Sequence, residues 1–393
     1  MTGPLKGLKI LDFTTLLPGP YATMMLSDLG ADVLRIVSGS RPDLTTLSPP
    51  FIGDTGLSTS SAFLGRGKRS MTLNLKDPRG VRIVHQLLST YDILIEQFRP
   101  GVMAKFGLSY ANVKEHYPSL IYCSLTGYGQ TGPLTGRAGH DINYLSRSGL
   151  MSYSGRIETG PVLTGMQIAD IASGSYNSII GLLSAIIYRQ ATGKGQYVDI
   201  SMTDGMIAFN AMVGASFLVT GQEPGREGHY LNGGSLYDFY ETKDHQYISF
   251  GGLEPQFFSA FCQAIGRSDL IAGSVMPPNG EQVKKEVREI IKTKTRDEWT
   301  EWCKQWDACF EPVLTLSEAL NDPLVKERGM IVEIGLPGGG QVKQLANPIK
   351  FSESPPRYDQ VGLPVGTHTR EVLQELGYDD QEIKEFEDSG LFS

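Results

Sequence analysis

Three short stretches of this chain place titratable side chains among small or apolar residues. The stretches read AGHDINY, IADIASG and GGLEPQF, and their titratable residues are His140, Asp141, Asp170 and Glu254. Such surroundings can move pKa values toward neutrality, where an acid and a base are best matched to exchange protons. The sequence therefore predicts proton-transfer chemistry.

Each of these residues also has a plainer explanation. A histidine titrates near physiological pH, and the alanine and glycine before His140 leave room for a ligand. A histidine that caps a helix or lies in the core explains the same spacing equally well. Asp170 and Glu254 each precede a predicted helix, so each could simply be an acid at a helix N-terminus.

If Asp170 and Glu254 are catalytic, their surroundings suggest different roles. Amides near Asp170 could stabilise a developing oxyanion. Glu254 follows two glycines and could hydrogen-bond an imidazole, fixing its tautomer and raising its basicity. The sequence alone leaves these alternatives open.

The elements that must position these residues alternate between strand and helix patterns. Strands are predicted at 8–13, 31–36, 70–75, 93–96, 121–124 and 197–201, with helices at 21–29, 78–88, 101–106, 174–189 and 204–219. Strand, helix, strand units imply parallel pairing through right-handed crossovers. We expect an α/β fold with a large Rossmann-like parallel sheet.

A length of 393 residues favours two domains. The Gly, Glu and Pro-rich stretch 221–228 is typical of a boundary. Beyond it, 237–242 and 247–250 predict a hairpin, followed by helices at 255–264, 282–292 and 296–306. We expect a large domain over 1–220, a small α+β domain over 221–330, and a C-terminal segment over 331–393, with a helix at 369–376, that returns to the large domain.

Composition excludes several classes of protein. A net charge of −8 argues against a nucleic-acid partner. Neither a signal peptide nor a membrane-spanning run is evident. The four cysteines lack zinc spacing and favour a cytoplasmic location with reduced thiols. The basic stretches 65–69 and 98–101 could meet phosphates, although a solvated basic surface is the simpler interpretation.

Longer motifs resemble a known family almost end to end. They include LDFTTLLPGPYATMMLSDLGADVLRI, GRGKRSMTLNLKDPRG, EQFRPGVMAKFGL, LTGYGQTGPLTGRAGHDINY, GKGQYVDISMTDG and DACFEPVLTLSEAL. With these motifs the chain resembles the alpha-methylacyl-CoA racemases. These belong to the class III CoA-transferase superfamily of the formyl-CoA transferase and carnitine CoA-transferase type.

The resemblance implies racemisation of 2-methyl-branched acyl-CoA thioesters by 1,1-proton transfer through an enolate. It makes His140 and Asp170 the acid and base, with Glu254 supporting His140 and Asp141 beside it. Transferases of the superfamily share the aspartate and use it as a nucleophile, so CoA transfer through an acyl-enzyme on Asp170 is the alternative. A protein that only binds CoA esters is a third possibility.

The resemblance also implies the ligand contacts and the assembly. We expect CoA contacts from Arg41, Leu73, Leu75, Lys76, Gln97, Phe98, Lys105 and Arg137. Arg41 would replace a family arginine that aligns with Ser38, Gln97 stands for a frequent asparagine, and Lys105 for a common arginine. No metal, and no cofactor beyond CoA as part of the substrate, is required. The family fold implies an interlocked homodimer.

Overall fold

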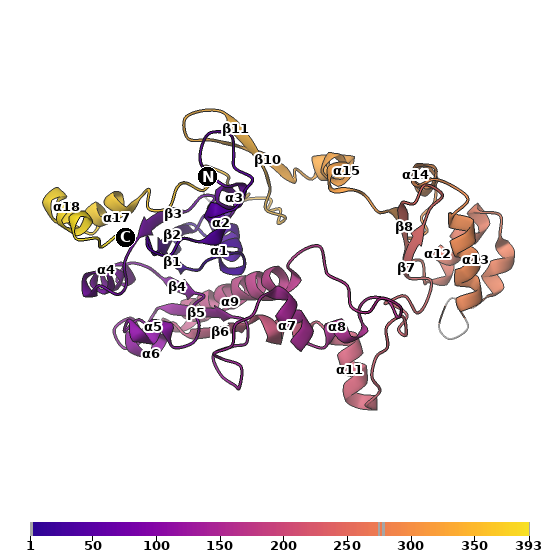
Figure 1. The fold of residues 1–393 in the computed structure, drawn as a ribbon, viewed down its shortest axis with the longest axis horizontal. Coiled ribbons are helices and arrows are strands. Elements are labelled where there is room, and N and C mark those ends of the chain that lie inside the picture. The colour runs from indigo at the N-terminus through magenta and orange to yellow at the C-terminus, as the bar shows by residue number, and fades with distance from the viewer. Residues whose placement is uncertain (1–2, 274–275, 277–279, 393) are drawn as a thin grey trace. The chain divides into compact units, whose positions relative to one another are not determined.

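The chain folds into two compact units in a computed structural model that describes residues 3–273, 276 and 280–392 (Figure 1). The first unit comprises Met1–Tyr144, Met166–Met206 and Leu324–Ser393, and the second comprises Leu145–Gly165 and Ile207–Pro323. This division differs from the expected ranges 1–220, 221–330 and 331–393. Residues 145–165 and 207–220 lie in the second unit, and residues 324–330 lie in the first.

The first unit is built on a six-stranded sheet in the order β3-β2-β1-β4-β5-β6. All neighbouring strands pair in parallel, which confirms the predicted sheet. The strands are β1 (Lys9–Phe13), β2 (Asp32–Val37), β3 (Arg69–Thr72), β4 (Ile93–Glu96), β5 (Ile121–Thr126) and β6 (Tyr197–Ser201). The strand order reverses between β1 and β4, where doubly wound sheets bind ligands at their carboxyl edge.

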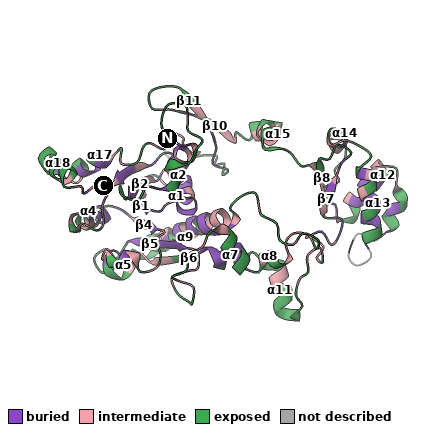
Figure 2. Cartoon of the chain, viewed as in Figure 1, coloured by how far each residue is buried: buried purple, intermediate pink, exposed green. Residues whose placement is uncertain are grey.

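Helices cover both faces of this sheet, and the buried residues lie along it (Figure 2). On one face, α1 (Pro18–Asp28) and α9 (Tyr176–Thr192) bury Met25 and Leu182 against the strands. On the other face, α4 (Pro78–Leu88) and α17 (Thr369–Glu375) bury Ile83 and Leu373. The long chain segments between strands therefore pack as the predicted crossovers require.

Shorter elements complete the first unit. They are α2 (Leu44–Leu47), α3 (Thr59–Leu64), α5 (Val102–Lys105), α6 (Tyr110–Val113), α7 (Asp141–Arg147), a π-helix (Ala169–Ser175), α10 (Met202–Ala208), α16 (Pro323–Glu327), the antiparallel pair β10 (Ile331–Gly335) and β11 (Gln341–Leu345), and α18 (Asp380–Asp388). The division between the units runs through α7, α10 and α16.

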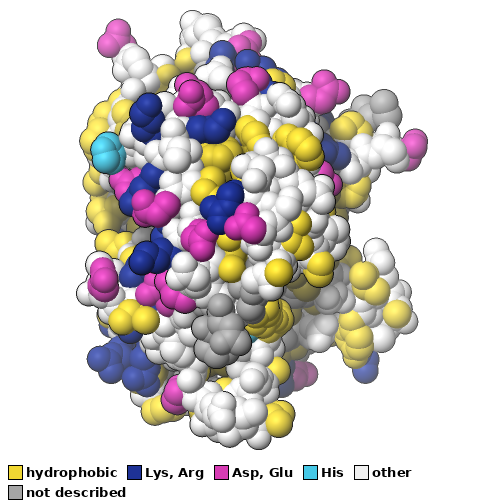
Figure 3. Space-filling view, turned by 90° about the vertical axis from the view of Figure 1, so that its right-hand side faces the viewer, with side chains coloured by type: hydrophobic (Ala, Val, Ile, Leu, Met, Phe, Trp, Pro, Cys, Tyr) yellow, Lys and Arg dark blue, Asp and Glu magenta, His cyan; other side chains and the backbone are white. Residues whose placement is uncertain are grey.

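The second unit contains an antiparallel sheet of β7 (Asp238–Glu241), β8 (Tyr247–Phe250) and β9 (Phe310–Pro312). The first two strands form the predicted hairpin. Its helices are α8 (Leu150–Tyr153), α11 (Ala211–Thr220), α12 (Pro255–Ala264), a 3-10 helix (Ser268–Ala272), α13 (Glu281–Ile291), α14 (Arg296–Cys303) and α15 (Leu316–Asn321). The face seen in Figure 3 intersperses Lys and Arg with Asp and Glu.

The predicted helix over 204–219 is wrong, because the chain forms two helices, α10 and α11, with a break at Phe209 and Asn210. The Asn210 side-chain amide donates to the carbonyl oxygens of Ile207 and Ser148, at 2.9 and 3.0 Å. Such side-chain bonds to the backbone compete with helix hydrogen bonds.

The predicted solvated basic surface over 65–69 is also wrong. Arg66 is 1% exposed and forms an ion pair with Asp28 at 2.7 Å. Lys68 is 3% exposed, and its ammonium donates to Thr23 Oγ1 and the Pro20 carbonyl oxygen. Both cations are therefore built into the fold.

Among the described residues, the helix over Ala169–Thr192 is long and apolar enough to span a membrane by length and composition, and α10 with α11 would count as a second span if joined. The first of these helices includes α9, which packs on β5 and β6. A core helix of a soluble protein passes the same test. All four cysteines are free thiols.

Candidate active site

Asp170 lies in the first turn of the π-helix, which continues directly into α9. The residue at the N-cap position is Ile168, so the alternative that Asp170 is a helix N-cap is wrong. The helix begins earlier than the predicted residue 174. π-Helical turns are rare and occur often at functional sites.

Asp141 connects α7 to this π-helix. Its Oδ1 accepts the backbone N–H of Asp170 at 3.0 Å, so residues 29 positions apart are joined by one hydrogen bond. Asp141 is the first residue of α7, and His140 precedes it. The fold thus places together two of the three sequence stretches that predicted proton transfer.

His140 caps α7 with its backbone. Its carbonyl oxygen accepts the N–H groups of Asn143 and Tyr144 at 2.8 and 3.3 Å, and its own N–H donates to Asn143 Oδ1 at 3.0 Å. The residue is exposed. The capping interpretation is therefore correct for the backbone, and it leaves the imidazole for other contacts.

The electrostatics of this cluster favour proton exchange at Asp170. Burial, and after it the Asp141 carboxylate, raise the pKa of Asp170, and His140 acts to lower it, so that the pKa lies at about 6. A carboxyl group that titrates near neutral pH can both accept and donate a proton under physiological conditions. Carboxyl groups with such shifted pKa values are concentrated at functional sites.

Two expectations are corrected: the one about the backbone amides near Asp170 and the one about the space that Gly139 leaves beside His140. The N–H of Asp170 is bonded to Asp141, and that of Ile171 to the Gln167 carbonyl oxygen at 3.1 Å, so an oxyanion needs other donors. A Cβ at Gly139 would lie 2.6 Å from the ring of Tyr144. The glycine therefore makes room for this tyrosine rather than for a ligand.

Glu254 lies in the second unit at the N-cap position of α12, without a side-chain capping bond. It is exposed and sits near Cys309, whose pKa is raised by burial and by the Glu254 carboxylate. A cavity of about 590 Å³ in this unit is lined by Gly251 and Cys309, among others. Its contact with His140 stays a prediction.

The expected CoA contacts all belong to the first unit. Several follow the carboxyl ends of strands: Arg41 comes after β2, Leu73, Leu75 and Lys76 after β3, and Gln97 and Phe98 after β4. The cationic side chains of the set are exposed: Arg41, Lys76, Lys105 and Arg137. This edge is where a doubly wound sheet presents a ligand crevice.

Three other expected CoA contacts, Leu73, Leu75 and Gln97, differ in how far their side chains are occupied by contacts within the fold. Leu73 is 1% exposed and packs in the core, whereas Leu75 is partly buried against it. Gln97 Oε1 accepts the N–H of Gly19 at 3.1 Å. Its side chain therefore supports the first turn of α1.

Sequence reasoning missed Glu96, the last residue of β4. It is 4% exposed, and its Oε2 accepts the N–H of Phe98 at 2.8 Å. Burial raises its pKa to about 7. The available signal was an acid that ends the apolar run Ile93–Ile95 and directly precedes two expected CoA contacts.

Among the residues that the structure describes, no group of three or more His, Cys, Asp or Glu side chains is arranged to hold a metal ion. The expectation that the reaction uses neither a metal nor a cofactor beyond CoA stays a prediction.

Near the carboxyl edge of a doubly wound parallel sheet, the chain places an aspartate with a pKa of about 6 beside a histidine. This combination is typical of an α/β enzyme. A model of CoA-transferase family III matches residues 5–369. The chain belongs to this family, and its enzymes include both transferases and racemases.

Relatives of both kinds are similar to this chain. Human succinyl-CoA:glutarate CoA-transferase is 33% identical over 99% of this chain and 90% of its own length. Human alpha-methylacyl-CoA racemase is 33% identical over 96% of this chain and 95% of its own length. A solved CAIB/BAIF family protein from Brucella suis is 31% identical, with a TM-score of 0.82, over 96% of this chain and all of that one.

Proposed function

We propose that this protein is a racemase or epimerase of 2-methyl-branched acyl-CoA thioesters. The single observation that carries the proposal is the placement of His140 and Asp141 beside Asp170, whose pKa is about 6. Proton transfer needs a base and an acid that both change charge near the working pH. The sequence motif AGHDINY supports the same branch of the family by resemblance.

In the proposed mechanism, the ionised Asp170 carboxylate removes the proton alpha to the thioester carbonyl. The electron pair of the broken C–H bond passes to the carbonyl oxygen and forms an enolate. Protonated His140 then returns a proton to the opposite face of the alpha carbon, and the enolate collapses to the inverted thioester. Each group exchanges roles in the reverse direction, and Glu254 is proposed to support the imidazole.

The proposal is tested by incubating a single epimer of a 2-methylacyl-CoA with the enzyme and separating the epimers by chiral chromatography. We expect conversion to an equal or epimeric mixture, lost in His140→Ala and in Asp170→Asn. A wild-type enzyme that leaves several such thioesters unchanged would refute the racemase assignment.

A second candidate function is CoA transfer, favoured by Asp170 itself and by the similarity to succinyl-CoA:glutarate CoA-transferase. In this reaction the Asp170 carboxylate attacks the thioester carbonyl, the C–S bond breaks, and CoA leaves as thiolate. The acyl-enzyme anhydride would then be trapped by hydroxylamine as a hydroxamate on Asp170. Transfer to a free carboxylic acid without epimerisation would decide for this candidate.

We also propose that the enzyme acts as a homodimer in the cytoplasm. Large apolar side chains on α9 and α11 support self-association because they are exposed in the single chain: Ile180, Ile187, Met212, Leu218 and Val219. Light scattering should give a mass twice that of the 43.0 kDa chain. A monomer at micromolar concentration would contradict this proposal.

A further inference from the structure

The loop between β1 and α1 contains a strained residue. Leu16 has a φ of 62°, in the left-handed region that a leucine rarely adopts. The loop lies at the carboxyl end of β1, beside the position where the strand order reverses. Strain at such a position persists only where neighbouring groups enforce it.

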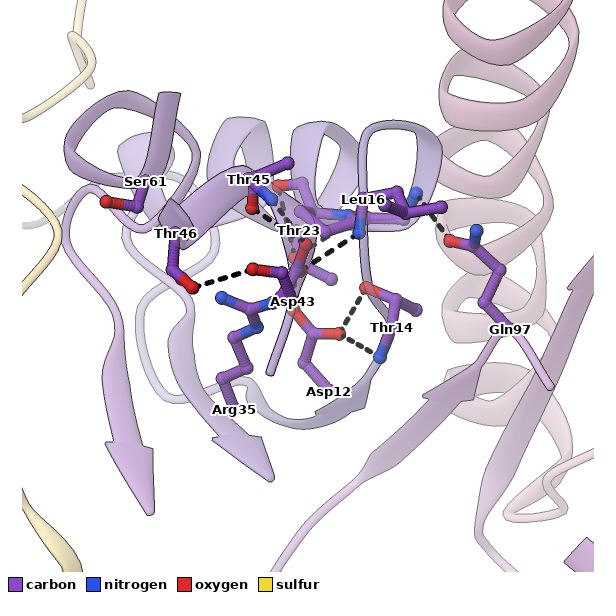
Figure 4. A network of polar contacts seen from close by, with 12 residues as sticks. Asp12, Thr14, Leu16, Thr23, Arg35, Asp43, Thr45, Thr46, Ser61 and Gln97 are labelled. Atoms are coloured by element: carbon purple, nitrogen blue, oxygen red, sulfur yellow. Dashed lines mark hydrogen bonds and ion pairs between the residues drawn. The ribbon is translucent and has the colours of Figure 1, made fainter. Parts of the chain in front are cut away.

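Asp43 enforces the conformation of Leu16. Its Oδ2 accepts the Leu16 N–H at 3.0 Å, and its Oδ1 accepts the N–H and hydroxyl of Thr45 at 3.0 and 2.9 Å. The guanidinium of Arg35 donates to the same carboxylate, and both of these charged residues are buried (Figure 4).

Asp43 is ionised in this setting. Burial acts to raise its pKa, but Arg35 and the backbone N–H groups outweigh burial and hold the pKa below its usual value. A carboxylate with filled acceptor positions is a stiff support for a loop.

Asp12 fixes the other end of the loop. Its Oδ1 accepts the Thr14 N–H at 2.8 Å, and its Oδ2 accepts the hydroxyl of Thr23 in α1 at 2.5 Å. Figure 4 shows both carboxylates facing the loop from below, with Gln97 on its far side. The loop and the first turn of α1, at Pro18 and Gly19, are therefore held by Asp12 in β1, by Asp43 at the N-cap of α2 and by Gln97 just after β4.

The π-helix that carries Asp170 packs against this first turn of α1. The Ser175 hydroxyl contacts the Pro18 carbonyl oxygen at 2.6 Å and the Asp170 carbonyl oxygen at 3.2 Å. A Cβ at Gly174 would lie 2.9 Å from the Cβ of Pro18, so this glycine lets the π-helix pack directly on Pro18. A shift of the loop would displace the helix.

We propose that Asp43 is a positioning residue for the reaction at Asp170. By holding Leu16 in the left-handed conformation, it fixes the turn on which the π-helix rests. The inference rests on the proposed function of Asp170, although its structural part is testable without that function.

The test compares Asp43→Ala with the double variant Leu16→Gly/Asp43→Ala. Loss of the carboxylate should release the loop, and kcat should fall by about tenfold to a hundredfold, as small misplacements of reacting groups do. Glycine adopts positive φ without strain, so Leu16→Gly should restore most of the lost kcat. The melting temperature should stay low in the double variant, because Arg35 remains unpaired.

The control is Asp359→Asn, which removes an exposed carboxylate paired with Arg357 in the same unit and should change nothing. If Asp43→Ala fails to fold, Leu16→Val serves instead, because a β-branched residue resists positive φ while the ion pair stays intact. Its kcat should fall comparably.

A function-independent readout separates this inference from the proposed function. Hydrogen exchange of the peptide covering residues 166–178 should accelerate in Asp43→Ala and recover in the double variant. Unchanged exchange and kcat in Asp43→Ala, or no recovery in the double variant, would overturn the inference. If wild-type enzyme lacks both epimerisation and transfer, the proposed function fails, and the exchange data alone decide the positioning role.

Discussion

At the scale of single residues, the fold turns an ordinary aspartate into a group that titrates near neutral pH. Burial dominates this change at Asp170, and the like charge of Asp141 adds to it. The same burial lowers the stability of the folded protein at neutral pH, because a carboxylate is harder to ionise when it is buried than when it is exposed. Function and folding therefore make opposite demands on this residue.

The first prediction concerns the stability of Asp170→Asn. The folded-state pKa of about 6 exceeds the usual aspartate value of 3.8, so between these pH values the folded protein keeps a proton that the unfolded chain has released. Stability contributed by the protonated form is thus lost as pH rises between these values. The variant lacks this loss, so its melting temperature relative to wild type should rise from pH 4 to pH 7. A constant difference would contradict the shifted pKa.

The second prediction concerns Asp141→Asn. Asparagine keeps the oxygen that accepts the Asp170 N–H, but it removes the negative charge that raises the Asp170 pKa. The acid limb of the kcat/KM profile should therefore move to lower pH, with activity retained above it. A limb that stays in place would show that Asp170 is not the titrating base.

At the scale of elements, α10 packs closely on the π-helix through a glycine. A Cβ at Gly205 would lie 1.9 Å from the Ser173 Oγ, whose hydroxyl donates to the Met202 carbonyl oxygen at 2.8 Å. Helix propensity favours Gly205→Ala, but the clash outweighs it. The contact makes the π-helix sensitive to α10.

The third prediction is that Gly205→Ala lowers the free energy of unfolding by about 1–3 kcal/mol, as overpacking does. Its kcat should fall as well, because Ser173 and Asp170 share one short helix. Gly335→Ala is the control, since a Cβ there meets nothing within 4 Å. Denaturant unfolding of both variants measures the difference, and equal stabilities would refute the packing argument.

The sequence predicts an element well where the residues that begin and end it are its own neighbours in the chain. Helix α4 has the predicted bounds of 78–88, because Asp77 caps it and Pro78 begins it. The break at Asn210 was not predicted, because it depends on the Ser148 carbonyl oxygen, far away in sequence. The buried pair of Arg66 and Asp28 was missed for the same reason.

The candidate site shows the same limit. His140, Asp141 and Asp170 stand out in the sequence because small neighbours surround them, and the structure brings them together. Asp43 and Leu16 gave no such signal, since a left-handed leucine is recognised only from the backbone. Residues that position a site are harder to predict than residues that perform its chemistry.

At the scale of the whole molecule, the two units divide the proposed machinery. The first holds His140, Asp170 and the expected CoA contacts, and the second holds Glu254. Membership of CoA-transferase family III leaves two reactions available to this arrangement. The choice between them depends on whether a proton or an acyl group moves to Asp170.

The most direct test of proton transfer is alpha-deuterium exchange in D2O, followed separately from each epimer by mass spectrometry. Wild-type enzyme should exchange both epimers and interconvert them. Since one base faces each side of the alpha carbon, His140→Ala should exchange one epimer only, and Asp170→Asn only the other, with interconversion lost in both. Exchange of both epimers at wild-type rates in either variant, or no exchange by wild-type enzyme, would contradict the two-base account.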